Sequence, residues 1–130
     1  MRLFDLLKKA FTKLGAIANY IVDEYDSGSW HIIKYSNGKC VVTTEQAYST
    51  AITNAGGFGY YRYQVFALPS VVKTVTKRHV SCMCNYPIAY SVMDSSSYPT
   101  NDDQIYVGVY CAGSTTRTVT YYIEVEGKWK

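Results

Sequence analysis

The sequence predicts a mainly β protein, an antiparallel β-sandwich of the jelly-roll type that follows one N-terminal α-helix. Three observations predict this fold class. Asn37-Gly38 lies between two apolar-rich runs, which is the strongest short-range signal of a β-hairpin. Several further short runs alternate apolar and polar residues between turn residues. Tyr, Thr, Val and Ser dominate the second half of the 130-residue chain, and they favour strands.

Residues 1–25 are expected to form the helix, and residues 26–130 the β-sandwich head. Apolar residues in the first stretch alternate spacings of four and three, the heptad pattern of a coiled coil. They are Leu3, Leu7, Ala10, Leu14, Ile17 and Ile21. We interpret them as the seam of a short parallel stalk, because isoleucine at both seam positions favours more than two strands. A helix packed on its own domain remains open, since Gly15 weakens helices. Asp5 and Asp23 disfavour a membrane-surface helix.

The hairpin over residues 30–44 is predicted to turn through a two-residue type I′ loop, because Asn-Gly supplies the positive φ angles it needs. This loop sets Tyr35 opposite Cys40. One face, assigned to the core, then carries Ile33, Tyr35, Cys40 and Val42. The other face carries Trp30, Ile32, Lys34 and Val41. It is too apolar for solvent, so we expect a neighbouring element or subunit to cover it. If a subunit covers it, Trp30 and Ile32 lie at the subunit interface.

Six later segments are predicted strands: residues 60–68, 71–76, 78–85, 88–93, 105–111 and 117–126. The last two alternate clearly and should bury one face. The residues on that face are Ile105, Val107, Val109, Cys111, Val119, Tyr121, Ile123 and Val125. Gly56, Gly57 and Gly59 mark a loop and not a phosphate site, since no helix follows that could present its N-terminus.

The composition argues against several classes of partner. A net charge of +3 is too small to indicate nucleic-acid binding. No apolar run reaches the length of a membrane span. Lysines interrupt the apolar positions of the N-terminus, so it is not a convincing signal peptide. We therefore expect an unprocessed chain made inside a cell, with neither nucleic acid nor an inserted membrane segment as partner.

Catalytic chemistry has little support in the sequence. His31 and His79 each lie within a strand pattern, and no motif of a nucleophile, metal site or cofactor site is present. The four cysteines, Cys40, Cys82, Cys84 and Cys111, lack the spacing of a zinc or redox motif and are expected to be free thiols. Asp94, Asp102 and Asp103 are more typical of a solvated acidic loop than of a calcium site. The sequence therefore assigns no catalytic residue, metal or cofactor.

Tyrosine is the more suggestive residue, with 14 copies. Its ring gives amphipathic contact area with little entropy to lose, which suits recognition surfaces. Most of these rings are expected in the core or in an interface. Tyr98 lies among Ser, Pro and Asp in the polar loop 94–103, where it is expected to be exposed.

Three segments resemble a C-terminal domain of bacteriophage and prophage minor structural proteins, including tail fibres. Residues 30–38 (WHIIKYSNG) resemble its W-x-x-x-K-W-x-[ND/S]-G segment, residues 54–61 (NAGGFGYY) its A-W-G-x-x-Y-Y segment, and residues 123–130 (IEVEGKWK) its terminal G-[RK]-W-K. Residues 20–24 are similar to the lead-in of longer members. Tyr35 and Gly56 stand where the family has tryptophan.

The resemblance implies a β-rich fibre-tip or head domain of a virion, commonly trimeric and without an enzymatic motif. We therefore expect a non-enzymatic homotrimer that assembles with other virion proteins and attaches to a bacterial surface glycan or protein. Tyr98, Asp102 and Asp103 are the candidate receptor contacts. A structural protein that caps or decorates the phage head or tail, without a receptor role, is the alternative. A small glycan hydrolase would need two close carboxylates, which nothing in the sequence indicates.

Overall fold

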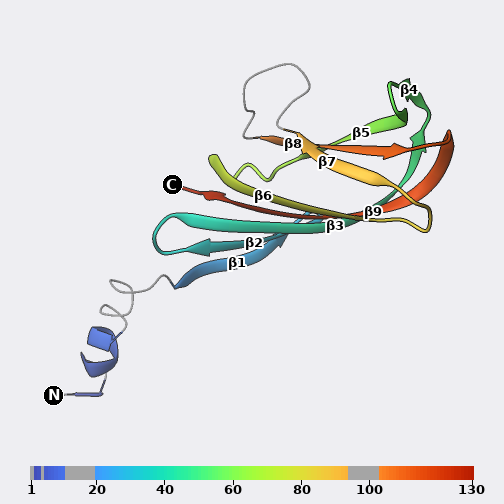
Figure 1. Ribbon diagram of the computed structural model, residues 1–130. Coiled ribbons are helices and arrows are strands. Elements are labelled where there is room, and N and C mark those ends of the chain that lie inside the picture. The colour runs from blue at the N-terminus through green and yellow to red at the C-terminus, as the bar shows by residue number, and fades with distance from the viewer. Residues whose placement is uncertain (1, 4, 11–19, 94–102) are drawn as a thin grey trace.

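The computed structural model describes residues 2–3, 5–10, 20–93 and 103–130 (Figure 1). The strands are β1 (Ile21–Ser27), β2 (Trp30–Tyr35), β3 (Lys39–Ile52), β4 (Asn54–Gly56), β5 (Gly59–Ala67), β6 (Thr74–Met83), β7 (Ala89–Met93), β8 (Gln104–Cys111) and β9 (Thr115–Lys128). They form a five-stranded sheet in the order β1-β2-β3-β9-β6 and a four-stranded sheet in the order β4-β5-β8-β7. Every strand pair is antiparallel. The predicted fold class, a mainly β antiparallel sandwich, is confirmed.

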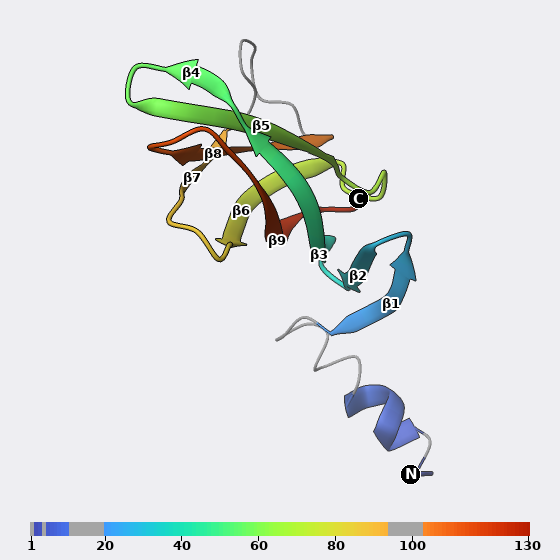
Figure 2. The same ribbon diagram turned by 90° about the vertical axis from the view of Figure 1, so that its right-hand side faces the viewer.

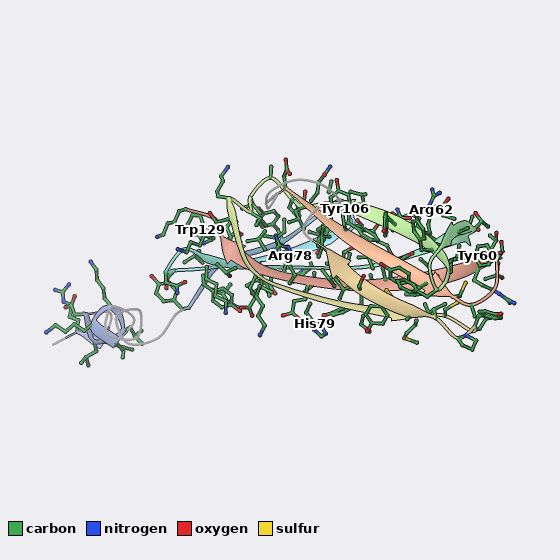
Figure 3. All side chains as sticks on the ribbon, turned by 45° about the horizontal axis from the view of Figure 1, so that its top comes forward. Tyr60, Arg62, Arg78, His79, Tyr106 and Trp129 are labelled. Atoms are coloured by element: carbon green, nitrogen blue, oxygen red, sulfur yellow. The ribbon has the colours of Figure 1, made fainter. Side chains whose placement is uncertain are left out.

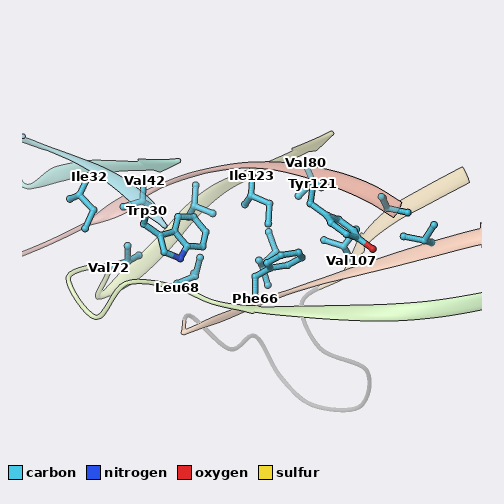
Figure 4. Close-up of a cluster of buried hydrophobic side chains, with 14 of the residues drawn as sticks. Trp30, Ile32, Val42, Phe66, Leu68, Val72, Val80, Val107, Tyr121 and Ile123 are labelled. Carbon is cyan, nitrogen blue, oxygen red and sulfur yellow. The ribbon is translucent and has the colours of Figure 1, made fainter. Parts of the chain in front are cut away.

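The hydrophobic core lies between the two sheets (Figure 4). Strands β8 and β9 contribute alternate residues to it, and each of the eight core positions predicted on these two segments is buried. Tyr121 is the largest fully buried side chain, and its hydroxyl lies 3.2 Å from Oγ1 of the buried Thr50. Burial raises the pKa of Tyr121, so this hydroxyl stays neutral and can share a hydrogen bond inside the core.

Strands β3 and β9 form the long axis of the sandwich, paired from Lys39 opposite Lys128 to Ile52 opposite Thr115. We call the Lys39 side the proximal end and the Ile52 side the distal end. The chain joins the sandwich at the proximal end, where Ser36 N–H donates to the Tyr20 carbonyl at 2.9 Å. The chain also ends there, and Figure 3 places Trp129 on the opposite side of the molecule from Tyr60 and Arg62.

The observed register of the β2–β3 hairpin differs from the predicted register by one residue. Lys34, and not Tyr35, lies opposite Cys40. Gly38 has φ +92° and donates its N–H to the Tyr35 carbonyl at 3.1 Å, whereas Asn37 does not have a positive φ. A type I′ loop requires positive φ at both central residues, so it is excluded here. The turn is a type I turn closed by a glycine bulge, a three-residue loop that Asn-Gly also suits.

This one-residue shift moves the side chains of β2 to the opposite face, because side chains alternate along a strand, whereas Cys40 and Val42 of β3 lie on the core face as predicted. The core face carries Trp30, Ile32, Cys40 and Val42, all buried. Ile33, Tyr35 and Val41 lie on the other face and are half-buried. Trp30 and Ile32 keep only 8% and 1% of their surface exposed, so assigning them to a subunit interface was wrong. Trp30 and Ile32 therefore pack in the core of their own protomer.

The predicted helix over residues 3–25 is wrong at its C-terminal end. Leu3 and residues 5–10 are helical, and Leu7 and Ala10 of the expected seam are exposed there. The seam positions Leu14 and Ile17 lie outside the described residues. Ile21 begins strand β1, which pairs with β2 at the edge of the larger sheet (Figure 2).

The sequence pattern of residues 26–29 suggests a break between helix and head, but Asp26 and Ser27 lie in β1 and Gly28-Ser29 is the turn of the β1–β2 hairpin. Ser27 lies opposite Trp30, and the loop between them is Gly28-Ser29. Gly28 has φ +59° and Ser29 does not have a positive φ, the combination found in a type II′ turn. The β head therefore begins at Ile21 and not at Asp26.

Candidate functional site

The loop expected to contact a receptor is only partly within the described residues. Tyr98 and Asp102 lie outside them. Asp103 is exposed just before β8, and its carbonyl accepts the N–H of Leu68 at 2.9 Å. Leu68 opens the connection to β6, which starts opposite Lys128. Asp103 therefore lies toward the proximal end, where the chain joins the sandwich.

The distal end carries a broad polar groove, which we call the distal groove. Its volume is about 920 Å³. It is lined by Cys82, Met83, Cys84, Asn85, Tyr86, Pro87, Ile88, Thr116, Arg117, Thr118 and Thr120. The groove forms where β6 leaves the larger sheet. Strand β6 ends at Met83 opposite Thr120, while β9 runs on beside β3 as far as Thr115. One edge of β9 is thus open to the groove.

Arg117 and Tyr86 form the ordered centre of the distal groove. The Arg117 guanidinium carbon lies 4.6 Å from the centre of the Tyr86 ring, a cation–π geometry. The Nε–H of Arg117 donates to Thr115 Oγ1 at 3.1 Å. Both side chains are half-buried. These two contacts fix the plane of the guanidinium.

A second, more apolar hollow of about 730 Å³ adjoins the groove, and the two share Pro87 and Ile88. We call it the apolar hollow. It is lined by Phe58, Tyr60, Pro87, Ile88, Ala89, Tyr90, Ser91, Tyr110, Cys111 and Ala112. Phe58 lies in the turn between β4 and β5 and is 90% exposed. The distal end thus combines a polar and an apolar concavity in one continuous surface.

Three tyrosines form a platform on the outer face of the smaller sheet, which we call the tyrosine platform: Tyr61, Tyr63 and Tyr110. The rings of Tyr61 and Tyr63 have centroids 5.0 Å apart, and those of Tyr61 and Tyr110 are 6.5 Å apart. The Tyr110 ring lies against Gly108, where an added Cβ would approach its hydroxyl to 2.7 Å. The absence of a side chain at Gly108 therefore lets the Tyr110 ring lie close to the sheet.

The Tyr63 hydroxyl of the platform is a neutral hydrogen-bonding group. Desolvation raises the pKa of Tyr63, and the neighbouring Tyr110 and Tyr61 raise this pKa further. The Tyr110 hydroxyl lies 3.3 Å from Ser91 Oγ, which also lines the apolar hollow. The platform and the hollow therefore form one surface that offers ring faces and hydroxyl groups together.

His31 forms a separate cluster on the larger sheet. Its Nδ1 lies 2.6 Å from Asp26 Oδ1 and its Nε2 lies 3.0 Å from Glu24 Oε1. The hydrogen bond to Asp26, and then the one to Glu24, raises the pKa of His31 above 6.5. A pocket of about 340 Å³ beside it is lined in part by Glu45 and Tyr122. This cluster joins β1 to β2 and lies apart from the distal surface.

Nucleophile and metal chemistry have no assembled site in the part of the chain that the structure describes. No group of three or more His, Cys, Asp or Glu side chains there could hold a metal ion. The four cysteines are free. Burial raises the pKa of the Cys82 thiol to about 11, so this thiol of the distal groove is protonated at neutral pH. A search of the described residues for a helix long and apolar enough to span a membrane finds none.

Sequence reasoning pointed to tyrosine and singled out Tyr98, but it did not single out the tyrosines of the distal surface. The alternation within residues 60–68 and 105–111 already separates outward from inward rings. It does not show that β5 pairs with β8, which is what brings Tyr61 opposite Tyr110. The Arg117–Tyr86 pair joins two segments thirty-one positions apart in sequence and left no local signal.

Comparison with protein-family models, with curated proteins and with solved structures finds no match for this chain.

Proposed function

We propose that this protein is a non-enzymatic head domain of a phage fibre, assembled as a homotrimer, that attaches to a bacterial surface glycan. One observation carries the proposal. The apolar hollow, the distal groove and the adjoining tyrosine platform gather at or near the end of the sandwich opposite the one where the N-terminal segment joins. A fibre head that is held at its proximal end presents its distal end to the cell surface.

The chemistry of the distal surface suits a saccharide. Sugar rings offer apolar C–H faces beside a rim of hydroxyls, and tyrosine offers a ring face beside one hydroxyl. Tyr63 and Tyr110 supply such faces, and Ser91 adds a further hydroxyl beside Tyr110. Ligand sites of this kind are largely apolar concavities with a few placed polar groups. The apolar hollow has that composition.

The virion and trimer parts of the proposal rest on the sequence. The phage assignment is supported by the resemblance of residues 30–38, 54–61 and 123–130 to a fibre-tip domain. The trimer is supported by exposed apolar side chains near the N-terminus. They are Leu3, Leu6, Leu7, Tyr20, Ile21 and Val22. Three copies of a weak distal site would bind a repetitive cell surface with high avidity.

The test is a screen of the full chain against an array of bacterial surface glycans, followed by two matched variants. Tyr63 of the platform and Tyr122 of the opposite sheet are 39% and 40% exposed. We expect Tyr63→Ala to weaken binding about tenfold, as for a central aromatic contact, and Tyr122→Ala to leave it unchanged. Both variants should keep the unfolding temperature close to that of the parent.

Other results would replace the proposal. Equal loss of binding in both variants would move the site away from the platform. Binding to cells that protease treatment abolishes would identify a protein receptor. If the folded protein binds neither glycans nor cells and instead co-purifies with assembled virions, it is a capping or decoration protein without a receptor role.

A further inference from the structure

The distal groove differs from the adjoining hollow in its charge. Among its lining residues, all of them within the described part of the chain, Arg117 is the one with a permanent charge, and no carboxylate is present. The threonines Thr116, Thr118 and Thr120 add hydroxyls on the other side of β9, because side chains alternate along the strand. The groove is therefore a cationic site with neutral hydrogen-bonding walls.

Arg117 is held in place while part of its guanidinium stays available. Its Nε–H is engaged by Thr115 Oγ1 at 3.1 Å, and its plane lies against the Tyr86 ring. The two terminal amino groups are the remaining donors of the fork. A guanidinium fixed in this way loses less entropy on binding a planar anion, because its orientation is set beforehand.

We propose that the distal groove binds the carboxylate of an acidic sugar, a uronic-acid residue within the bacterial surface glycan. A carboxylate is planar and carries one charge, which matches the paired donors and the single charge of Arg117. The ring of such a sugar would lie near Tyr86, with its hydroxyls toward Asn85 and the open edge of β9. This inference rests on the proposed attachment to a glycan and adds the class of sugar at one subsite.

The distal groove and the apolar hollow share a wall, so the proposed acidic sugar lies next to a second sugar subsite. Pro87 and Ile88 line both the groove and the apolar hollow. An extended glycan that crosses this wall would place a neutral sugar beside Tyr110 and an acidic sugar beside Arg117. Charge selectivity and aromatic stacking therefore belong to two adjacent subsites of one surface, and they are separable by mutation.

The test uses the uniformly ¹⁵N-labelled full chain and three small probes: methyl β-D-glucuronide, methyl β-D-glucoside and glucose 6-phosphate. Amide shifts on titration report which residues each probe approaches. We expect the glucuronide to shift signals of residues 82–86 and 116–120, and the glucoside to leave those signals unchanged. Arg117→Gln should weaken glucuronide binding about tenfold, the loss typical of one charge-assisted contact. Arg62→Gln, an exposed arginine on β5 outside the groove lining, should have no effect.

Each outcome either supports the inference or overturns it. If the glucuronide leaves the groove signals unshifted, or if Arg62→Gln matches Arg117→Gln, the inference is wrong. A groove that responds to the phosphate and not to the glucuronide reassigns its ligand and overturns the carboxylate. Glucoside shifts at residues 88–91 and 110–112 test the proposed function independently. If the glucoside shifts these signals while the glucuronide shifts none in the groove, glycan attachment is retained and only the acidic subsite is rejected.

Discussion

At the scale of single residues, His31 makes two carboxylate contacts that the sequence does not predict. A neutral imidazole carries one N–H, whereas each ring nitrogen of His31 faces a carboxylate oxygen, of Asp26 and of Glu24. Both contacts are hydrogen bonds donated by the ring only when it is protonated. The sequence correctly places His31 on a strand, but the two acids belong to a segment predicted as helix and turn.

The pH dependence of stability follows from the raised pKa of His31. Its stabilising effect is complete below the unfolded-state value of 6.5 and is lost as the pH rises through the higher folded-state pKa. Glu45 and Tyr122, which line the adjacent pocket, face the same region. We predict that His31→Gln lowers the unfolding temperature near pH 5.5 by a few degrees at most, since the ring is partly exposed, and has almost no effect near about pH 8.5.

The control for this prediction is His79→Gln, since His79 is exposed on β6 of the same sheet. Its difference from the parent serves as the reference for a histidine-to-glutamine change at each pH value. Thermal unfolding measures these values. If the loss of unfolding temperature in His31→Gln stays constant or grows toward alkaline pH, protonated His31 does not stabilise the fold through Asp26 and Glu24.

Gly108 provides a residue-scale test of the tyrosine platform. An added Cβ there would lie 2.7 Å from the Tyr110 hydroxyl and 3.1 Å from its ring, so Gly108→Ala must displace that ring. The backbone of Gly108 does not have a positive φ, so alanine fits the strand itself. We predict several-fold weaker glycan binding with the unfolding temperature unchanged or slightly raised.

Gly57→Ala is the matched control, because nothing lies within 4 Å of a Cβ added there. Binding isotherms of both variants against the array-selected glycan decide the matter. Unaltered binding by Gly108→Ala would show that the position of Tyr110 is irrelevant to attachment.

At the scale of elements, most strands were predictable, whereas their register and their long-range pairing were not. Alternation located the strands over 105–111 and 117–126 and their buried faces, since one face of each packs in the core. The β2–β3 register failed because Asn-Gly serves both a two-residue loop and a glycine-bulged one. Strand β1 was predicted as helix because Ile21 extends the heptad spacing, while its actual partner, β2, follows it in sequence. Pairing with a neighbour outweighed a weak local pattern.

Two adjacent isoleucines test the register directly. Ile32 is 1% exposed on the core face, whereas Ile33 is half-buried on the opposite face. We predict that Ile32→Ala lowers the free energy of unfolding by about 2–5 kcal/mol, as for a buried aliphatic residue, and Ile33→Ala by about 1 kcal/mol or less. Urea unfolding measures both values. The reverse order of the two losses would restore the type I′ register.

At the scale of the whole molecule, the sequence predicted a two-layer β head but not the distal surface on which the proposed function rests. Asp103, the one described residue of the candidate loop, lies toward the proximal end. The distal surface depends on contacts between distant segments, namely β5 with β8 and the departure of β6 from β9. No local pattern encodes such contacts, so the Arg117–Tyr86 pair and the two concavities emerged only from the fold.

The proposed trimer gives a prediction at the same scale. Light scattering of the full chain should report three times the 14.7 kDa chain mass. A version starting at Tyr20 keeps β1 and should dissociate more readily, because it lacks the exposed apolar residues of the helical segment. A version starting at Asp26 would not test the helical segment alone, because it would also lack most of β1. A full chain that stays monomeric at high concentration would refute the trimeric fibre head.

The most direct test of glycan attachment through the distal end is a crystal structure of the full chain with the glycan selected from the array. We predict that the saccharide lies over Tyr63 and reaches into the apolar hollow beside Tyr110. A saccharide bound at the proximal end, around Asp103 and Leu68, would contradict this account and return the site to the loop that the sequence first suggested.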